Sequence, residues 1–411
     1  MAESQPGTLT CDVCIAGGGM VGGVLGCGLA QQGFRVTLLE QREPARDWPE
    51  DEIDLRVSAL SRASQRVLEN LLVWRRMQSL RVSPYRAMYV WDAGGFGGIG
   101  FDAADIGEPD LGHIVENRVT QLALWERMGD FDNLLRLCPD GPAQMALDDE
   151  QGPLLLLQSG RRVRASLIVG AEGANSPVRE MAGIHSSGWS YDQQAIVANI
   201  RTQHYHGEVA RQRFMPSGPL ALLPIDDGHC SIVWSTSLAE AGRLMALHEA
   251  DFCQALSLAS ERVLGDVIEV GPRASFPLGL RNADRYVSPG LALVGDAAHG
   301  VHPLAGQGVN MGILDAAALV DVLVAARESG RALGSLTTLR RYERARKAAD
   351  IGMLGAMDLF KRLFSNSSPP LTLVRNLGLN LANIVTPFKR LTVRRAMGLA
   401  GELPSLARKR V

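Results

Sequence analysis

The chain has 411 residues, of which 46% are hydrophobic and 21% are charged, and its formal net charge is −2. This composition is typical of a globular protein of two or three domains, and the near-zero net charge argues against a general nucleic-acid binder. The polar first ten residues show no signal-peptide pattern, and no run of 18 or more apolar residues predicts a membrane-spanning helix.

A strand–helix–strand unit opens the chain. Asp12–Ala16 is predicted to be a buried strand, Val21–Gln32 the following helix and Phe34–Glu40 the next strand. The loop between the first strand and the helix, Gly17–Gly22, has the spacing GxGxxG. Such glycines let the backbone turn tightly and approach a pyrophosphate at the positive end of the helix.

The end of the second predicted strand carries residues expected beside a nucleotide. Glu40 can accept hydrogen bonds from an adenosine ribose, and a carboxylate there argues against a 2′-phosphate. Arg42 can cover the adenine or the phosphates. The loop is therefore predicted to bind a dinucleotide other than NADPH.

Neither the cysteines nor the histidines predict a metal site. Six scattered cysteines favour reduced thiols in a cytosolic protein over a disulfide framework. Cys11 and Cys14 form a CxxC pair on the first strand without a second ligand pair nearby, so we interpret them as strand filler. No carboxylate or cysteine completes a ligand set with His299 and His302, Pro303 intervenes, and a flavin explains the helix start better than a metal does.

The middle of the chain changes from helical to strand-rich. Ser61–Leu80 and Asn117–Met128 have helical spacing, whereas Arg86–Phe101 alternates around a glycine-rich turn and is predicted to be a hairpin. Arg162–Glu172 is predicted to be another strand. Strand-like runs then dominate from 188 to 280, notably Gln194–Thr202, Gly218–Pro224 and Cys230–Ser235.

A second glycine-rich turn lies in Leu291–Gly312. Asp296 ends its strand, where a carboxylate can bind ribityl hydroxyls. Gly306-Gln307-Gly308 then opens a helix, Val309–Val324, whose first amides can face a flavin pyrimidine ring. Two such loops about 280 residues apart favour one elongated cofactor held at both ends, FAD.

The sequence predicts an α/β fold in which a Rossmann-like FAD-binding domain is interrupted by a mainly antiparallel β-sheet substrate domain and followed by a C-terminal helical extension. The FAD-binding domain takes residues 1–185 and 285–345, and the substrate domain takes residues 186–284, which the hairpin region 82–110 joins. Residues 346–411 form the C-terminal helical region with a basic tail.

The C-terminal region combines an apolar helical stripe with basic residues. After Asp315 the pattern is helical, broken at Ser365–Pro370, and the tail Val385–Val411 carries seven basic residues and one acidic residue. This pattern is compatible with a helix on an anionic membrane surface and equally with a helix packed on its own domain. The stripe consists of Leu371, Val374, Leu377, Leu381, Ile384 and Phe388.

Taken together, these motifs resemble the FAD-dependent aromatic hydroxylases of the para-hydroxybenzoate hydroxylase type, and within them the ubiquinone-biosynthesis hydroxylases. The resemblance extends over nearly the whole chain, and VARQRF at Val209–Phe214 and LRRYERARK at Leu339–Lys347 are most similar to the 2-polyprenylphenol hydroxylase group. The other segments that carry it are GGGMVGG at Gly17–Gly23, DLRVSALSRAS at Asp54–Ser64, LGHIVENRVTQLALW at Leu111–Trp125, GAEGANSPVR at Gly170–Arg179, SIVWS at Ser231–Ser235 and GDAAHGVHPLAGQGVN at Gly295–Asn310.

The resemblance implies a monooxygenase in which NAD(P)H reduces FAD, O2 adds at the flavin C4a position and the hydroperoxide hydroxylates an electron-rich phenol. It also implies a lipophilic polyprenylphenol substrate, other ubiquinone-biosynthesis proteins as partners, no nucleic acid, and a cytoplasmic location on the anionic surface of the inner membrane. The cofactor-binding residues expected from the two loops and from the resemblance are Gly17, Gly19, Gly22, Glu40, Arg42, Arg56, Asn117, Gln121, Asp296, Pro303, Gly306, Gly308 and Asn310.

The substrate wall is expected on the strands of the middle sheet. Apolar strand residues are more often plain core than ligand contacts, so these candidates are weaker than those of the loops. The sequence indicates no side chain there that could act as a base toward a phenol, so it predicts no catalytic acid or base. The candidates are Phe214, Leu220, Leu222, Pro224, Trp234 and Phe276.

One position departs from the family pattern. Glu172 stands where the family has an aspartate in a GADG turn. Its longer side chain can reach the same backbone amides, or it can loosen contacts used by FAD or by the nicotinamide. A flavin-binding, non-catalytic scaffold of the quinone biosynthetic complex, its catalysis weakened by Glu172, therefore stays open as an alternative. A flavin hydroxylase of a soluble aromatic compound stays open independently of Glu172.

Overall fold

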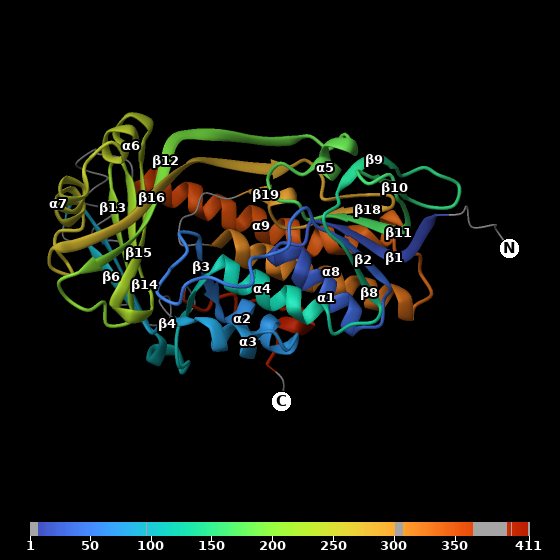
Figure 1. The fold of residues 1–411 in the computed structure, drawn as a ribbon, viewed down its shortest axis with the longest axis horizontal. Coiled ribbons are helices and arrows are strands. Elements are labelled where there is room, and N and C mark those ends of the chain that lie inside the picture. Colours follow the sequence, from blue (N-terminus) through green and yellow to red (C-terminus); the bar gives the residue numbers. More distant parts are fainter. Residues whose placement is uncertain (1–6, 96, 301–306, 365–392, 396, 410–411) are drawn as a thin grey trace.

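Two large sheets organise the chain, and two long strands join them. The computed structural model describes residues 7–95, 97–300, 307–364, 393–395 and 397–409. Figure 1 shows a mixed, helix-covered region at the right and a strand-rich region at the left, with β12 and β16 running between them. The predicted α/β class with an inserted antiparallel sheet is confirmed.

The first sheet has the order β17-β18-β11-β1-β2-β8 and is parallel along its centre. β1 pairs in parallel with β2 and β11, and β11 pairs in parallel with β18. Parallel neighbours need crossover connections and are buried on both faces, which explains the apolar runs in these strands. The strands are β1 Thr8–Ala16, β2 Val36–Leu39, β8 Leu134–Leu137, β9 Pro142–Ala146, β10 Leu154–Leu157, β11 Arg162–Gly170, β17 Val287–Ser288 and β18 Leu291–Leu293.

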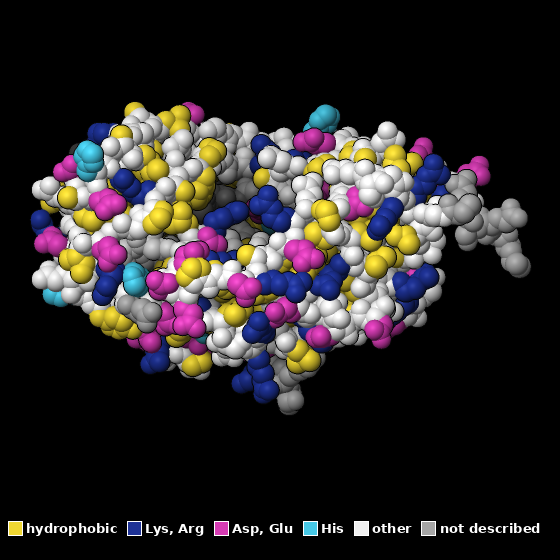
Figure 2. Space-filling model, viewed as in Figure 1, with side chains coloured by type: hydrophobic (Ala, Val, Ile, Leu, Met, Phe, Trp, Pro, Cys, Tyr) yellow, Lys and Arg dark blue, Asp and Glu magenta, His cyan; other side chains and the backbone are white. Residues whose placement is uncertain are grey.

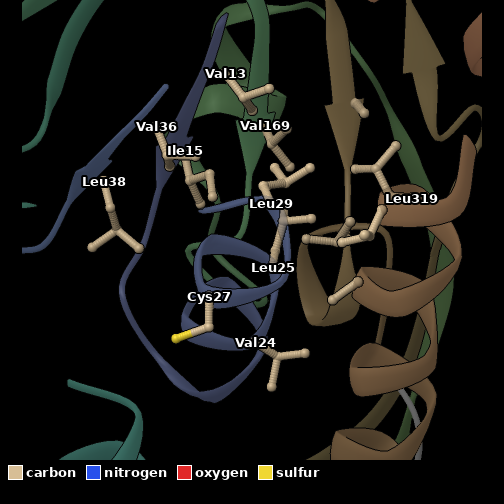
Figure 3. Close-up of a cluster of buried hydrophobic side chains, with 14 of the residues drawn as sticks. Val13, Ile15, Val24, Leu25, Cys27, Leu29, Val36, Leu38, Val169 and Leu319 are labelled. Carbon is tan, nitrogen blue, oxygen red and sulfur yellow. The ribbon is translucent and has the colours of Figure 1, made fainter. Parts of the chain in front are cut away.

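Helices cover the first sheet and enclose the main hydrophobic core. Figure 3 shows side chains of β1, β2, β11, α1 and α8 meeting in this core. α1 approaches α8 closely, because a Cβ on Gly28 would lie 2.9 Å from Val320 Cγ2. The helices of this region are α1 Met20–Gln31, α4 Asn117–Met128, α5 Pro177–Met181, α8 Gln307–Glu328 and α9 Leu336–Phe364.

α8 is long and apolar enough to cross a membrane by length and composition. However, 67% of its most apolar window, within Gly308–Glu328, is buried inside the protein, and it packs against α1 and α9. We therefore interpret α8 as a core helix.

The second sheet has the order β19-β16-β12-β15-β14-β13-β5-β6 and is antiparallel except between β13 and β5. β12 and β16 are each 17 residues long, so they extend from this sheet back to the first region. α6 Leu238–Met245 and α7 Glu249–Ala259 pack on one face. The strands are β5 Ala87–Asp92, β6 Gly98–Asp102, β12 Ser186–Thr202, β13 Val209–Met215, β14 Gly218–Pro224, β15 His229–Ser237, β16 Val267–Ala283 and β19 His299–Gly300.

A three-stranded sheet, β4-β7-β3, lies between the two regions, with β4 at Ser83–Tyr85, β7 at Gly112–Glu116 and β3 at Val57–Ser61. The single helix expected over 61–80 is two helices, α2 Arg62–Asn70 and α3 Trp74–Leu80. The break lies at Leu72, whose φ of +63° is incompatible with a continuing right-handed helix.

The C-terminal segment that the structure describes packs against α2 and against the region around η1. Leu406 and Ala407 are buried, and the Asn70 side chain donates a hydrogen bond to the Leu406 carbonyl at 2.7 Å. Val393 and Met397 pack into a small core beside η1, a short 3-10 helix at Ala103–Ile106. The predicted apolar stripe from Leu371 to Phe388 lies outside the described residues.

Candidate active site

The first glycine-rich loop has a shape that only glycine permits. Gly17 has a φ of +99°, and a Cβ on it would lie 2.5 Å from the Ala171 carbonyl oxygen. A Cβ on Gly22 would lie 1.9 Å from the Gly17 carbonyl oxygen, so Gly22 allows α1 to start directly behind the loop. β1 therefore turns into α1 within three residues and points the amino end of α1 at the space in front of the loop.

Both glycine-rich loops lie on one cavity because β1 and β18 both pair with β11. The carboxyl ends of these parallel strands lie at one edge of the sheet, where open α/β folds bind ligands. The cavity has a volume of about 670 Å3. Figure 2 shows a hollow between the two halves of the molecule, with Lys and Arg side chains at its rim. The expected site residues that line the cavity are Gly17, Gly19, Glu40, Arg56, Asn117, Gln121, Asp296 and Gly308.

Glu40 is held rigidly at one wall of the cavity. Its carboxylate accepts hydrogen bonds at 2.7 Å from the amides of Gly18 and Gln41, and at 3.2 Å from the amide of Arg42. The Arg42 side chain is exposed and is not among the residues that line the cavity. Glu40 is therefore placed to bind a ribose, whereas Arg42 contributes only its backbone amide, which donates to the Glu40 carboxylate.

A second helix points its amino end at the cavity. Asn117 and Gln121 lie one turn apart on the same face of α4, and both line the cavity. Ser58 Oγ donates to Asn117 Oδ1 at 2.6 Å, and the Asn117 amide donates to the Arg56 carbonyl at 2.8 Å. These bonds fix Arg56 and the start of α4 together, so a guanidinium and a positive helix end meet at an anion-binding wall.

Asp296 supplies a carboxylate to the second loop. It lies in η3, the short 3-10 helix Gly295–Ala297, where it lines the cavity and is exposed to it, while protein packs closely around its other sides. That burial raises the pKa of Asp296, and the charges of His299 and Arg56 oppose the shift. A carboxylate between two cations is suited to accept hydrogen bonds from sugar-alcohol hydroxyls.

Glu172 closes one side of the cavity and caps α5. It accepts a hydrogen bond from Ser176 Oγ at 2.7 Å and one from the Val178 amide at 3.2 Å. Burial raises the pKa of its carboxyl group, while these hydrogen bonds favour the ionised form. The longer side chain thus reaches one backbone amide, that of Val178 in the first turn of α5.

The substrate candidates divide between the two faces of the second sheet. Leu220, Leu222 and Trp234 pack with α6 and α7 in a separate core, so the expectation that they form the cavity wall is wrong. Phe214 lies on the opposite face with Leu223, which packs against β3 and β7 of the cavity-bearing region. Alternation marks two faces of a strand, but only the position of α6 and α7 decides which face is covered.

Polar residues on that opposite face were missed in the sequence. Asn199 of β12 pairs with Ser231 of β15, and both lie in the same cross-strand row as Leu223. The Asn199 amide donates to the Ile53 carbonyl at 2.9 Å, which holds the segment leading to Arg56 against the sheet. No sequence pattern distinguished these residues from ordinary strand polar residues.

Of the other substrate candidates, Pro224 is buried and Phe276 is 39% exposed on β16.

Asn310 has structural contacts instead of facing the cavity. Its side chain accepts hydrogen bonds from the Ser61 amide at 2.8 Å and from Ser64 Oγ at 2.7 Å, and donates to the Ala59 carbonyl at 2.8 Å. These bonds join the start of α8 to β3 and α2, and Asn310, expected to bind the cofactor, is not among the residues that line the cavity. Pro303 and Gly306 lie outside the described residues.

Comparison with known proteins places these features in a family. Residues 144–354 match the family model described as an FAD binding domain. The chain is 42% identical to 3-demethoxyubiquinol 3-hydroxylase of Escherichia coli (strain K12) over 388 residues, which are 94% of this chain and 98% of that protein. The chain belongs to the ubiquinone-biosynthesis hydroxylases. It is an FAD-dependent monooxygenase, as the resemblance implied.

Two other relatives also align with this chain over most of their length. The chain is 38% identical to ubiquinone hydroxylase UbiL of Rhodospirillum rubrum, covering 97% of this chain and 92% of that protein. It is 36% identical to ubiquinone biosynthesis monooxygenase COQ6 of Rattus norvegicus, covering 92% and 89%. These names support a hydroxylase over a non-catalytic scaffold. The relative that is 42% identical is named a 3-demethoxyubiquinol 3-hydroxylase, whereas the sequence motifs were most similar to the 2-polyprenylphenol hydroxylase group.

Solved structures show the same fold at lower identity. p-Nitrophenol 4-monooxygenase PnpA of Pseudomonas putida matches with a TM-score of 0.77 at 19% identity, covering 96% of this chain and 99% of that chain. PqsL, a probable FAD-dependent monooxygenase of Pseudomonas aeruginosa, matches with a TM-score of 0.74 at 24% identity, covering 90% and 99%. At such identities the likeness shows the fold alone.

The residues of the cavity fit FAD. The tight approach around Gly17 and Gly22 leaves room for a pyrophosphate at the start of α1. Glu40 at the end of β2 and Asp296 in the second loop put one carboxylate at each end of the cavity, as an adenosine ribose and a ribityl chain require. A cavity of about 670 Å3 lies within the usual range for cofactor sites.

Proposed function

We propose that this chain hydroxylates the aromatic ring of a polyprenylphenol in ubiquinone biosynthesis, using NAD(P)H and O2. The observation that carries the proposal is the FAD-shaped cavity of the two glycine-rich loops, in a chain 42% identical over nearly its whole length to a 3-demethoxyubiquinol 3-hydroxylase. The cofactor supplies the reduction and oxygen chemistry, and the protein binds, orients and shields it.

The chain's own residues have separate tasks in this proposal. Glu40 and the starts of α1 and α4 hold the adenosine and pyrophosphate end, while Asp296 holds the ribityl end of the cofactor. The sheet face that carries Phe214 forms the opposite wall for the phenol ring. Because that wall is mainly apolar, it excludes water from the reacting ring.

The test is a quinone-lipid profile by mass spectrometry in a strain that lacks this chain. We expect loss of ubiquinone and accumulation of an intermediate that lacks one ring hydroxyl, whose structure also gives the ring position. The wild-type chain should restore the profile, whereas a Gly17→Ala chain, which should not hold FAD, should not. An unchanged profile in a strain without a second hydroxylase of this family would favour a soluble aromatic substrate.

We further propose that the protein works at an anionic membrane surface on the cytoplasmic side of the inner membrane, because its proposed substrate stays in the bilayer. Two regions of the described C-terminal segment support this proposal. Arg394 and Arg395 are exposed, as are Arg408 and Lys409. Their apolar neighbours Val393 and Leu406 are buried in the protein, so electrostatic attraction would be the main contribution of these residues.

A further inference from the structure

Four buried charged side chains lie directly behind the turn that carries Asp296. His299 of β19 has its Nε2 2.5 Å from Asp315 Oδ2 of α8. Arg346 of α9 donates from Nε to Asp315 Oδ1 at 2.7 Å and from Nη2 to Asp350 Oδ1 at 2.9 Å. None of the four is more than 9% exposed. We call these residues the quartet.

The quartet has the donor atoms of a metal site but not its charge balance. His299, Asp315 and Asp350 bring possible ligand atoms within 4.8 Å of one another. However, Arg346 already donates to both carboxylates, and His299 already bonds to Asp315. An added cation would therefore meet a guanidinium and would compete for occupied oxygens.

The quartet is joined to the cavity through the backbone. Asp315 Oδ2 also accepts a hydrogen bond from the Gly295 amide at 3.1 Å, and Gly295 begins the turn that presents Asp296. His299 ends the same turn, so Asp315 holds it at both ends. The charge of His299 also favours the ionised form of Asp296.

We propose that His299 and Asp315 are positioning residues for FAD, which hold the turn from Gly295 to His299 in its binding shape and place a fixed positive charge behind Asp296. Arg346 acts from α9 by holding Asp315, and Asp350 holds Arg346 in turn and lies 3.5 Å from His299 Nε2. This inference concerns cofactor binding alone and does not depend on the substrate that we propose.

The electrostatics of the quartet favour a protonated His299. Burial lowers the pKa of His299, but the charge and hydrogen bond of Asp315 outweigh burial and raise it to about 9. Burial likewise raises the pKa of Asp315, but His299 and Arg346 outweigh burial and lower it to about 2. The charged groups that act on His299 are Asp296 in η3, Asp315 on α8 and Asp350 on α9, and the ring of Tyr286, with Lys347 over it, lies beside the His299 ring. Arg346 and Tyr342 on α9 act in turn on Asp315 and Asp350.

The protonation of His299 makes FAD binding depend on pH in a defined direction. The pKa of His299 is raised from 6.5 in the unfolded chain to about 9, so the folding stability that its protonation contributes is fully present below pH 6.5 and is lost as the pH rises through about 9. In the folded protein, the positive charge that His299 places behind Asp296 is lost over the range around pH 9. FAD affinity in the wild-type protein should therefore fall over this upper range.

The experiment is titration of the apoprotein with FAD, without substrate, at about pH 8 and about pH 10, on either side of the His299 pKa of about 9. His299→Gln keeps a donor that reaches Asp315 but carries no charge. We expect this variant and Asp315→Asn to raise the Kd for FAD about tenfold at the lower pH, as loss of a charged hydrogen bond predicts. The further rise in Kd with pH should be smaller in His299→Gln than in the wild type, because titration of FAD itself is common to both proteins.

Asp321→Asn is the matched control, because Asp321 lies on the same helix but bonds to the Ser405 amide at 2.8 Å, away from the turn. Its Kd for FAD should stay within about twofold of the wild-type value. A purely structural role for His299 would lower the melting temperature without changing the pH dependence, and equal pH profiles in wild type and His299→Gln would overturn the proposal. If Asp315→Asn fails to fold, the His299→Gln comparison decides alone.

Discussion

Gly17 and Gly19 stand two residues apart in one loop, yet a side chain would meet different surroundings at each. At Gly17 the φ is +99° and an added Cβ would lie 2.5 Å from a carbonyl oxygen. At Gly19 the φ is −65° and no protein atom lies within 4 Å of an added Cβ, because that side opens into the cavity. The first glycine is therefore needed by the fold and the second by the ligand.

The pair of substitutions Gly17→Ala and Gly19→Ala tests this division. Gly17→Ala should lower the free energy of unfolding of the apoprotein by about 2 kcal/mol or more, and FAD should be lost, because the backbone must shift. Gly19→Ala should change that free energy by about 1 kcal/mol or less but weaken FAD binding. Urea unfolding of the apoproteins and FAD titration measure both effects. Equal loss of stability in the two variants would contradict the assignment.

At the scale of elements, the second sheet shows that strand alternation separates two faces but does not tell which face forms the wall of a site. β13 and β14 alternate between buried and partly exposed residues, and both of their faces contain apolar residues. α6 and α7 cover the face with Leu222, which leaves the face with Phe214 toward β3 and β7. The candidate wall of the site therefore follows from where two helices pack.

Leu222→Ala and Phe214→Ala should separate stability from substrate binding. Leu222→Ala should lower the free energy of unfolding by about 2–5 kcal/mol, because it leaves a hole in the core under α6 and α7, and should leave KM for the phenol unchanged. Phe214→Ala should raise KM. Denaturant unfolding and steady-state kinetics give the two quantities. A raised KM in Leu222→Ala at unchanged stability would return Leu222 to the substrate wall.

At the scale of the whole molecule, the cavity is built from segments that are far apart in the chain. β1 and β18 meet only through β11, and α4 and Arg56 reach the same cavity from the three-stranded sheet between the two regions. The described C-terminal segment folds back against α2 and leaves its arginines exposed. Truncation of this segment would therefore disturb packing as well as charge.

A charge substitution tests membrane association without this complication. Arg394→Gln with Arg395→Gln should lower binding to anionic liposomes about 30-fold, because each basic residue contributes about 1 kcal/mol near such a surface. FAD should stay bound. Arg340→Gln with Arg341→Gln, an exposed adjacent pair on α9, is the matched control. Equal co-sedimentation of the two double variants with anionic liposomes would remove the support for this surface.

The sequence by itself determined the features that depend on local covalent geometry. The spacing of Gly17, Gly19 and Gly22 and the carboxylates Glu40 and Asp296 at strand ends predict FAD, because a tight turn and a helix start follow from a few adjacent residues. The tertiary structure alone decided which sheet face the helices cover, that Asn310 joins α8 to α2, and that His299 meets Asp315, Arg346 and Asp350. Such choices depend on packing between elements distant in the chain, which neither periodicity nor spacing records.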